Sequence, residues 1–309
     1  MCETGMVLSE LSFMIRHTKK FARKHRVMTP LAQFHASSYQ MPCPYGVVLV
    51  MSPWNYPFML TIDPLIDAIA AGNTVMVKPS AYSPYTSQII EEILTNVFPK
   101  EYVSVILGGR KENQALLEEK FDYIFFTGSP YVGHEVMYKA SVHLTPVTLE
   151  LGGKSPCIVD ETANIKLAAR RIVFGKYLNL GQTCVAPDYI YVHTSVKDKL
   201  IHEVIQEIKR QYQDLSSYGK IINEKHFDRI SKLLDPNKIV YGGKTNRETL
   251  KIEPTIMDHV SWDDAVMQEE IFGPIMPILT FTNFEDCINI IKEKPSPLAL
   301  YLFSSNKTR

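Results

Sequence analysis

The stretch "YGVVLVMSPWNYPF", residues 45–58, decides the fold of this chain. Its apolar run predicts a buried strand that breaks at Pro53. A helix over residues 65–73, ended by Gly72, and a second buried strand over residues 74–80 are predicted next. Strands that alternate with helices predict an α/β fold with a parallel sheet covered by helices on both faces.

The same alternation continues along the rest of the chain. Residues 29–44 carry prolines among polar residues and are predicted as an extended connector. The first helix begins soon after Met1, and the last strand needs a partner but ends near Arg309. We therefore expect the chain to be truncated at both ends. Further strands are predicted over residues 102–109, 123–129, 147–153, 189–194 and 297–306, and helices over 6–25, 84–98, 130–140, 161–180, 196–212 and part of 281–294.

The composition excludes several classes of partner. Basic and acidic residues number 33 each, so neither a nucleic acid nor an anionic membrane is expected to bind. No apolar run approaches the ~18 residues of a membrane-spanning helix, and the N-terminus places acids before bases, unlike a signal peptide. The five cysteines lack paired spacing, so no metal site is expected and a reducing, cytoplasmic location is predicted.

One cysteine lies in an unusual place. Cys184 belongs to "LNLGQTCVAPDYIYV", residues 178–192, a segment of small and polar residues that favours a turn. Pro187 disfavours a helix here, and Gly181 allows the backbone to approach a ligand closely. The residues alone leave two interpretations open: a half-buried structural thiol, or a nucleophile that a substrate can reach.

Two polar residues follow or end predicted strands. Glu150 ends the apolar-rich "VTLEL" and is either paired or desolvated with a raised pKa, in which case it suits a general base. Asn55, between the prolines of "PWNYP", either holds a turn or donates to a developing oxyanion.

Three further stretches suit a phosphate or a ribose. In "FTGSPYVG", residues 126–133, Ser129 is predicted to cap a helix whose N–H groups face an anion, although the full GxGxxG pattern is absent. Lys78 in "VKPS" either reaches a phosphate or ribose hydroxyl or is a solvated strand-end lysine. The acids of "QEEIFGP", residues 268–274, either bind a ribose hydroxyl pair or form a solvated turn.

Six motifs in this order resemble the aldehyde dehydrogenase superfamily: "PWNYPF", "AIAAGNTVMVKPS", "FFTGS", "LELGGKSP", "GQTCVAPDY" and "QEEIFGP". The wordings "LTPVTLELGGKSPC" and "VMQEEIFGPIMPI" are most similar to the class 3 branch of fatty and aromatic aldehyde dehydrogenases. The resemblance implies a Rossmann-like cofactor domain over residues 1–151 and an α/β catalytic domain over 152–309. It also implies a small β arm for oligomerisation, which would include residues 26–44, and a homodimer.

The resemblance further implies NAD(P)+-dependent oxidation of a small-molecule aldehyde to a carboxylic acid. Cys184 would attack the carbonyl, Asn55 and the Cys184 N–H would bind the oxyanion, and Glu150 would activate the water that hydrolyses the thioester. Trp54 and Tyr56 would flank the substrate entrance. The positions that would contact the cofactor are Lys78, Ser80, Gly128, Ser129, Gly133, Leu151, Gly152, Glu270 and Phe272.

One departure bears on the choice of cofactor. Residue 81 is alanine where the family commonly has an acid that holds the adenosine ribose, so NADP+ becomes plausible beside NAD+. Two alternatives to a dehydrogenase remain at this point: a cysteine esterase that acts through Cys184 without a cofactor, and a cofactor-binding fragment that is catalytically impaired.

Overall fold

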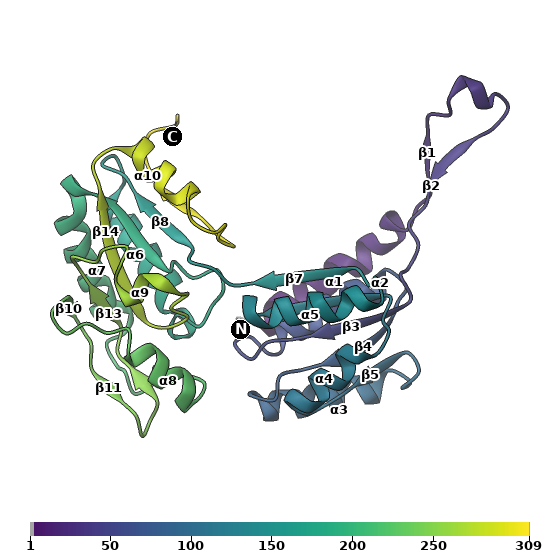
Figure 1. Cartoon of the computed structure of the whole chain (residues 1–309), viewed down its shortest axis with the longest axis horizontal. Coiled ribbons are helices and arrows are strands. Elements are labelled where there is room, and N and C mark those ends of the chain that lie inside the picture. The colour runs from purple at the N-terminus through teal and green to yellow at the C-terminus, as the bar shows by residue number, and fades with distance from the viewer. Residues whose placement is uncertain (1–2, 309) are drawn as a thin grey trace. The chain divides into compact units, whose positions relative to one another are not determined.

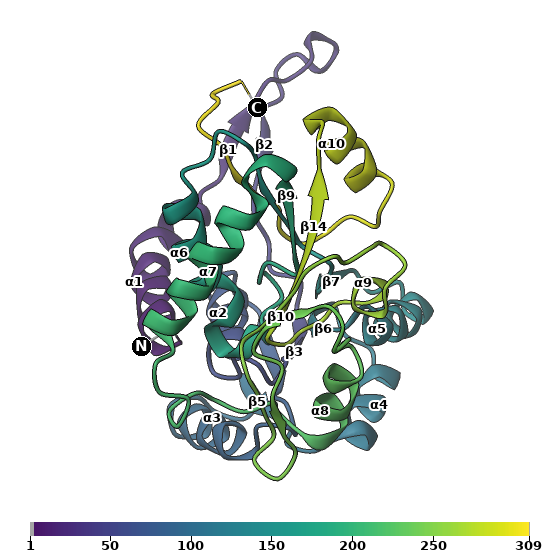
Figure 2. The same cartoon turned by 90° about the vertical axis from the view of Figure 1, so that its left-hand side faces the viewer.

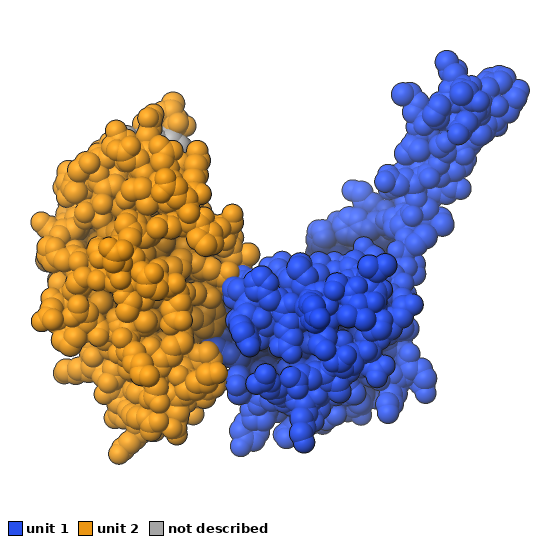
Figure 3. Space-filling model, in the orientation of Figure 1, with its two compact units in different colours: residues 1–151 blue, residues 152–309 orange. Residues whose placement is uncertain are grey.

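The computed structural model describes residues 3–308, which leaves Cys2 outside the described part. The chain divides into two compact units, Met1–Leu151 and Gly152–Arg309 (Figure 3). Each unit has its own sheet and its own pair of hydrophobic clusters.

The first unit is built on a five-stranded parallel sheet with the order β5-β4-β3-β6-β7, which confirms the predicted parallel sheet. From the central strand β3 the chain moves outward to β4 and β5, then crosses to β6 and β7. The order therefore reverses between β3 and β6, which is where ligands bind in open α/β sheets. The strands are β3 (Val47–Met51), β4 (Thr74–Lys78), β5 (Val103–Val105), β6 (Tyr123–Gly128) and β7 (Val147–Leu151).

Alternate residues of β3 face two different hydrophobic clusters. Leu49 and Met51 pack with residues of α4 and α5, whereas Val48 and Val50 pack with residues of α2 and α3. This burial on both faces explains why the strand reads as an unbroken apolar run. The helices of the unit are α1 (Thr4–Phe21), α2 (Met59–Ala70), α3 (Pro84–Val97), α4 (Arg110–Glu118) and α5 (Pro130–Val142).

Helix α2 begins at Met59, six residues before its predicted start. Its N-terminus is capped from outside the segment, because Glu3 Oε2 accepts the N–H groups of Phe58 at 2.8 Å and Met59 at 3.1 Å. A carboxylate at a helix N-terminus stabilises it. This contact joins residues 55 positions apart, so the local pattern could not predict it.

The expected connector over residues 29–44 contains a strand instead. β2 (Ser38–Gln40) pairs antiparallel with β1 (His25–Val27), with His25 opposite Gln40. A short 3-10 turn, Leu31–Gln33, lies between them. The hairpin is exposed and projects from the rest of its unit (Figure 1), as an arm would.

Three acids gather where α1 packs on α2. Burial raises the pKa of Asp63 to about 6, and the nearby Glu10 and Asp67 add to the rise. One Asp63 oxygen is buried and has no hydrogen-bond partner among the described residues. Since the folded state binds this proton more tightly than the unfolded state, Asp63 makes the unit less stable as pH rises from about 4 to about 6.

We predict that Asp63→Asn stabilises the protein at pH 7 by about 1 kcal/mol, less than the full shift because the group is partly exposed. At pH 4, where the native carboxyl is protonated, the gain should vanish. Urea denaturation at both pH values measures the difference. Exposed Asp263→Asn is the control and should change stability little at either pH. An equal effect of Asp63→Asn at both pH values would contradict the prediction.

The second unit has a six-stranded sheet with the order β10-β13-β14-β9-β8-β15. All neighbours are parallel except β10 and β13. The strands are β8 (Pro156–Val159), β9 (Tyr189–His193), β10 (Ile239–Tyr241), β13 (Thr255–Met257), β14 (Ile275–Phe281) and β15 (Tyr301–Phe303). A separate two-stranded hairpin joins β11 (Thr245–Asn246) to β12 (Lys251–Ile252).

Helices pack on both faces of this sheet. α6 (Ile165–Tyr177) and α7 (Lys197–Gln211) lie side by side on one face (Figure 2) and form one hydrophobic cluster with β8, β9 and β14. The second cluster includes residues from α8 (Glu224–Ser231), α9 (Ala265–Gln268) and α10 (Phe284–Lys292).

Several sequence predictions for this unit need correction. The helix predicted over 161–180 begins after its cap Asn164 and ends at Tyr177; Leu178 then has a non-helical backbone, and the left-handed residues begin at Asn179. The last predicted strand is only three residues long and does have a partner, β8. Strand β14 was not predicted; its sequence "IMPILTF" contains Pro277, a residue usually excluded from central strands.

Candidate active site

Cys184 is the first central residue of a tight turn between α6 and β9. The Ala186 N–H donates to the Thr183 carbonyl at 3.0 Å and closes this turn. The thiol is half-buried, whereas Cys43 is exposed and Cys157 and Cys287 are buried. Burial raises the pKa of Cys287 to about 12 and that of Cys157 further, so those thiols are inert. Among the described cysteines, Cys184 alone combines a defined turn with partial access.

The backbone before the turn is unusual. Asn179, Leu180 and Gly181 all have left-handed φ angles, of 50°, 56° and 69°. A Cβ on Gly181 would lie 2.3 Å from the Gly273 carbonyl oxygen, so only glycine fits. This close approach places the Cys184 segment directly against the "QEEIFGP" segment, which the sequence analysis predicted separately.

Gln182 anchors the start of the turn. Its side chain is buried, its Nε2 donates to the carbonyls of Asn179 at 3.2 Å and Lys220 at 3.3 Å, and its Oε1 accepts from the Ile222 N–H at 3.0 Å. A buried amide whose nitrogen and oxygen are both hydrogen-bonded restrains the backbone that carries it. Sequence reasoning missed this role.

Glu270 does not form a solvated turn. Burial raises its pKa to about 7; the Gly153 N–H donates to the carboxylate, which opposes the rise. A Cβ on Gly152 would lie 2.1 Å from Glu270 Oε2, so this glycine permits the close approach. Phe272 follows with a left-handed φ of 46° and is half-buried. The exposed acid of the pair is Glu269, which bonds to Arg229 at 2.9 Å.

A buried charge cluster supports the same segment. Asp188 is 3% exposed; it forms an ion pair with Lys154, and its Oδ1 accepts the Ile271 N–H at 2.9 Å. Lys154 also donates to the carbonyls of Val266 and Glu269. Burial lowers the pKa of the nearby Lys176 to about 8, while Asp188 opposes that change. The charges of "GGKSP" and "APDY" were visible in the sequence, but nothing there showed that they meet.

In the first unit, Lys78 ends β4 and is buried, which excludes the solvated lysine. Its Nζ donates to the carbonyls of Gly108 at 2.7 Å and Pro79 at 2.9 Å, and burial lowers its pKa. Ser80 begins the turn into α3: its Oγ accepts the Tyr82 N–H at 3.2 Å, and its carbonyl accepts from Ser87. Lys78 is the last residue of β4, and Ser80 lies two residues beyond it.

The predicted phosphate turn joins β6 to α5. Ser129 caps α5 by accepting the Val132 N–H at 3.4 Å, as expected. Gly128 packs over the Phe126 ring, and Gly133 packs against Leu151, whose Cδ2 would lie 2.8 Å from an added Cβ. An exposed N-terminus of a 13-residue helix fits the pyrophosphate of a dinucleotide.

The remaining candidates lie at two other strand ends of the first unit. Trp54, Asn55 and Tyr56 are half-buried in the loop between β3 and α2, each engaged in contacts. Glu150 is exposed on the edge strand β7, opposite Thr127 of β6. Of the two environments predicted for Glu150, the desolvated one is therefore not observed on this strand.

Residues 2–309 match the family model described as "Aldehyde dehydrogenase family". The chain belongs to the aldehyde dehydrogenase family. It is 49% identical to 4,4'-diaponeurosporen-aldehyde dehydrogenase of Staphylococcus aureus, with 99% of this chain and 68% of that protein covered. It is 44% identical to aldehyde dehydrogenase family 3 member A2 of Rattus norvegicus, with 98% and 64% covered. The chain thus spans about two thirds of the length of these relatives.

Solved structures of aldehyde dehydrogenases have the same fold. The substrate-bound structure of Staphylococcus aureus AldH superposes with a TM-score of 0.96 at 48% identity, covering 99% of this chain and 68% of that one. An aldehyde dehydrogenase of Mycobacterium tuberculosis complexed with NAD+ gives 0.88 at 28% identity, covering 97% and 64%. These likenesses confirm the predicted family and fold. The family consists of oxidoreductases that act on aldehydes and use NAD or NADP, which confirms the predicted classes of enzyme and cofactor.

The part of the chain that the structure describes holds no helix long and apolar enough to cross a membrane.

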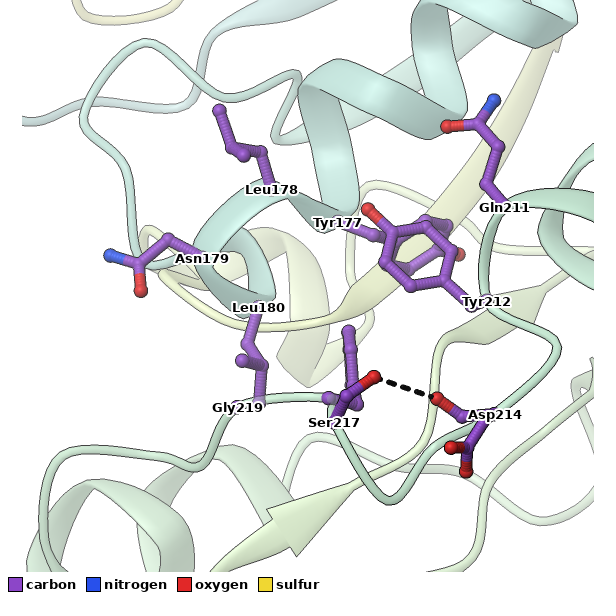
Figure 4. Close-up of a pocket in the computed structure, with 10 residues that line it drawn as sticks. Tyr177, Leu178, Asn179, Leu180, Gln211, Tyr212, Asp214, Ser217 and Gly219 are labelled. Atoms are coloured by element: carbon purple, nitrogen blue, oxygen red, sulfur yellow. Dashed lines mark hydrogen bonds between the residues drawn. The ribbon is translucent and has the colours of Figure 1, made fainter. Parts of the chain in front are cut away.

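A cavity of about 280 Å³ lies beside the left-handed segment that precedes Cys184 (Figure 4). Its lining includes Asn179, Leu180 and the three tyrosines Tyr177, Tyr212 and Tyr218. The Tyr177 hydroxyl donates to the Thr255 carbonyl at 3.1 Å, whereas the buried Tyr218 hydroxyl has no partner among the residues described.

We predict that Tyr218→Phe stabilises the protein by about 1 kcal/mol, because it removes a buried hydroxyl that gains no hydrogen bond. Tyr177→Phe is the matched control and should destabilise by about 1 kcal/mol, since it leaves a carbonyl without its donor. Urea denaturation measures both variants. Destabilisation of equal size in the two variants would show that Tyr218 has a partner, such as a buried water.

Proposed function

We propose that this chain carries the chemistry of NAD(P)+-dependent oxidation of an aldehyde to a carboxylic acid, with Cys184 as the nucleophile. The observation that carries the proposal is the turn at Cys184. Its thiol is only half-buried, and its backbone is held against the segment that contains Glu270. Family membership supports it and does not favour the esterase.

The first step is the attack of the Cys184 thiolate on the carbonyl carbon. A C–S bond forms, the C=O π bond breaks, and its electrons move to oxygen. The Asn55 amide and the Cys184 N–H donate to this oxyanion, and loss of one such donor typically costs ~10²–10³ in rate. When bound, the cofactor supplies the hydride acceptor. As the oxyanion collapses, the C=O π bond re-forms and hydride leaves the carbon, which gives a thioester on Cys184. Water that Glu150 deprotonates then hydrolyses this thioester and releases the carboxylic acid and the free thiol, so one hard oxidation becomes two easier steps.

The cofactor-binding roles follow from the chemistry of the side chains. The α5 N-terminus at Ser129, flanked by Gly128 and Gly133, suits the pyrophosphate. Lys78 and Glu270 suit ribose hydroxyls, as a donor and an acceptor. Ser80, Leu151, Gly152 and Phe272 complete the proposed cofactor contacts.

We propose that Trp54 and Tyr56 contact the substrate, an aldehyde with an apolar or aromatic body. Ala81 leaves space without negative charge after "KPS", and one mouse relative is named NADP-preferring, so use of NADP+ is proposed beside NAD+. A cytoplasmic homodimer, joined in part through the β1–β2 hairpin, is proposed as well; size-exclusion chromatography with light scattering tests the dimer.

The test is the near-ultraviolet absorbance of reduced nicotinamide. The chain is mixed with a medium-chain or aromatic aldehyde and with NAD+, NADP+ or no cofactor. Formation of reduced cofactor in proportion to the acid formed supports the proposal. The cofactor that is reduced faster shows whether the chain prefers NAD+ or NADP+. Hydrolysis of an ester with no oxidation of any aldehyde would overturn it in favour of an esterase.

We predict that Glu150→Gln slows steady-state turnover by about 10²-fold or more but spares the first turnover. The amide cannot accept the proton of the attacking water, so the thioester should accumulate. Rapid mixing should then show a burst of reduced cofactor equal to the enzyme concentration. Glu135→Gln, at a half-buried position of α5 that has no proposed role in the chemistry, is the control. Loss of the burst itself would assign Glu150 to the steps before hydride transfer.

A further inference from the structure

Tyr301, on the edge strand β15, contacts the turn that carries Cys184. Its Oη donates to the carbonyl oxygen of Val185 at 2.5 Å, and Val185 directly follows Cys184. Tyr301 pairs with Cys157 of β8 in the sheet register, and its ring packs against the hydrophobic cluster of α6 and α7. The hydroxyl is therefore held by the sheet on one side and by the turn on the other.

This bond clamps one particular peptide unit. The Ala186 N–H of the Val185–Ala186 peptide donates to the Thr183 carbonyl at 3.0 Å and closes the turn. The carbonyl of the same peptide accepts from Tyr301. Both polar groups of the peptide are thus engaged, which fixes its orientation. Since Cys184 is the adjoining central residue, its backbone is restrained with this peptide.

Two other contacts restrain the chain on either side of the turn. Gln182 holds the chain before the turn, and after it the Asp188 N–H donates to the Ser155 carbonyl at 2.8 Å. Val185 between them is 43% exposed, so packing alone restrains it weakly. Burial, and to a lesser extent Cys157 and Cys184, raises the pKa of Tyr301, so the phenol stays a protonated donor at neutral pH.

We propose that Tyr301 is a positioning residue for the nucleophile, which holds the Cys184 thiol where it can attack a carbonyl. This inference rests on the proposed function, because it assumes that Cys184 reacts. Misplacement of a reacting group by about 1 Å can cost ~10²-fold in rate, so a single hydrogen bond at this peptide matters.

The experiment compares wild type, Tyr301→Phe and the control Tyr241→Phe, whose ring is half-buried against the same cluster. Each full chain is treated with iodoacetamide, and modification of each cysteine is followed by mass spectrometry. Exposed Cys43 is the internal reference, and buried Cys287 reports global opening. In Tyr301→Phe alone, the ratio of the Cys184 rate to the Cys43 rate should rise about three- to tenfold, as expected for one lost hydrogen bond.

The same variants are assayed for aldehyde oxidation. Tyr301→Phe should lower kcat about tenfold while the KM for cofactor stays unchanged, since the cofactor contacts are intact. If wild type oxidises no aldehyde, the proposed function fails, yet the alkylation ratio still decides the role of Tyr301. An unchanged ratio, or a Cys287 rate that rises in step with Cys184, would overturn the proposal.

Discussion

Replacing Cys184 by alanine should lower aldehyde oxidation by at least about 10³-fold, because it removes the thiol proposed to form the covalent thioester. The structure strengthens this expectation, since Cys157 and Cys287 are buried with raised pKa and cannot substitute for it. Cofactor affinity should not change, because the residues proposed to bind the cofactor are untouched. Steady-state rates and a fluorescence titration with reduced cofactor measure the two quantities.

The matched control for this variant is Cys43→Ala. Cys43 is exposed, so the change should leave activity within about twofold. Comparable activity in Cys184→Ala and wild type would contradict the assignment of the nucleophile. A loss in both variants would indicate that thiol removal acts through stability, which a parallel urea titration would reveal.

The largest effect on stability is expected for Asp188→Ala. Asp188 is 3% exposed, and its carboxylate pairs with Lys154 and accepts the Ile271 N–H. Removing one partner of a buried ion pair typically costs ~3–5 kcal/mol. Here Lys154 and the buried Lys176 would lose their counter-charge, although Lys154 would keep its two carbonyl acceptors. Urea denaturation of the purified chain measures the loss.

Asp198→Ala provides the control for that prediction. Asp198 also faces a lysine, Lys197, at 3.6 Å, but its side chain is 94% exposed. An exposed pair is screened by water and contributes little, so this variant should unfold close to wild type. Equal losses in the two aspartate variants would show that burial does not set the strength of the Asp188 pair.

Much of the fold could be predicted from local patterns. The apolar runs of β3, β4 and β6 and the periodic helices between them indicated a parallel sheet, because strands buried on both faces need apolar residues throughout. The start of helix α2 could not be predicted, because the distant residue Glu3 caps it. Strand β14 was not predicted, and it contains Pro277 although it lies in the middle of a sheet.

The candidate site also contains residues that the sequence predicted and residues that it did not. Residue types and motifs were sufficient to name Cys184, Glu150, Asn55 and Glu270 as candidates, because thiol, carboxylate and amide chemistry is a property of the side chain. The roles of Gln182, Asp188 and Tyr301 could not be predicted, because each depends on contacts with residues that are distant in the sequence.

The sequence by itself therefore determined the family and the alternation of strands and helices, and it supplied the candidates for the reactive groups. Only the tertiary structure decided their environments: that Lys78 is buried, that Glu270 has a raised pKa, and that Glu150 is exposed. The physical reason is that burial and hydrogen bonding depend on which segments pack together. That packing brings Gly152 against Glu270 and Gly181 against Gly273.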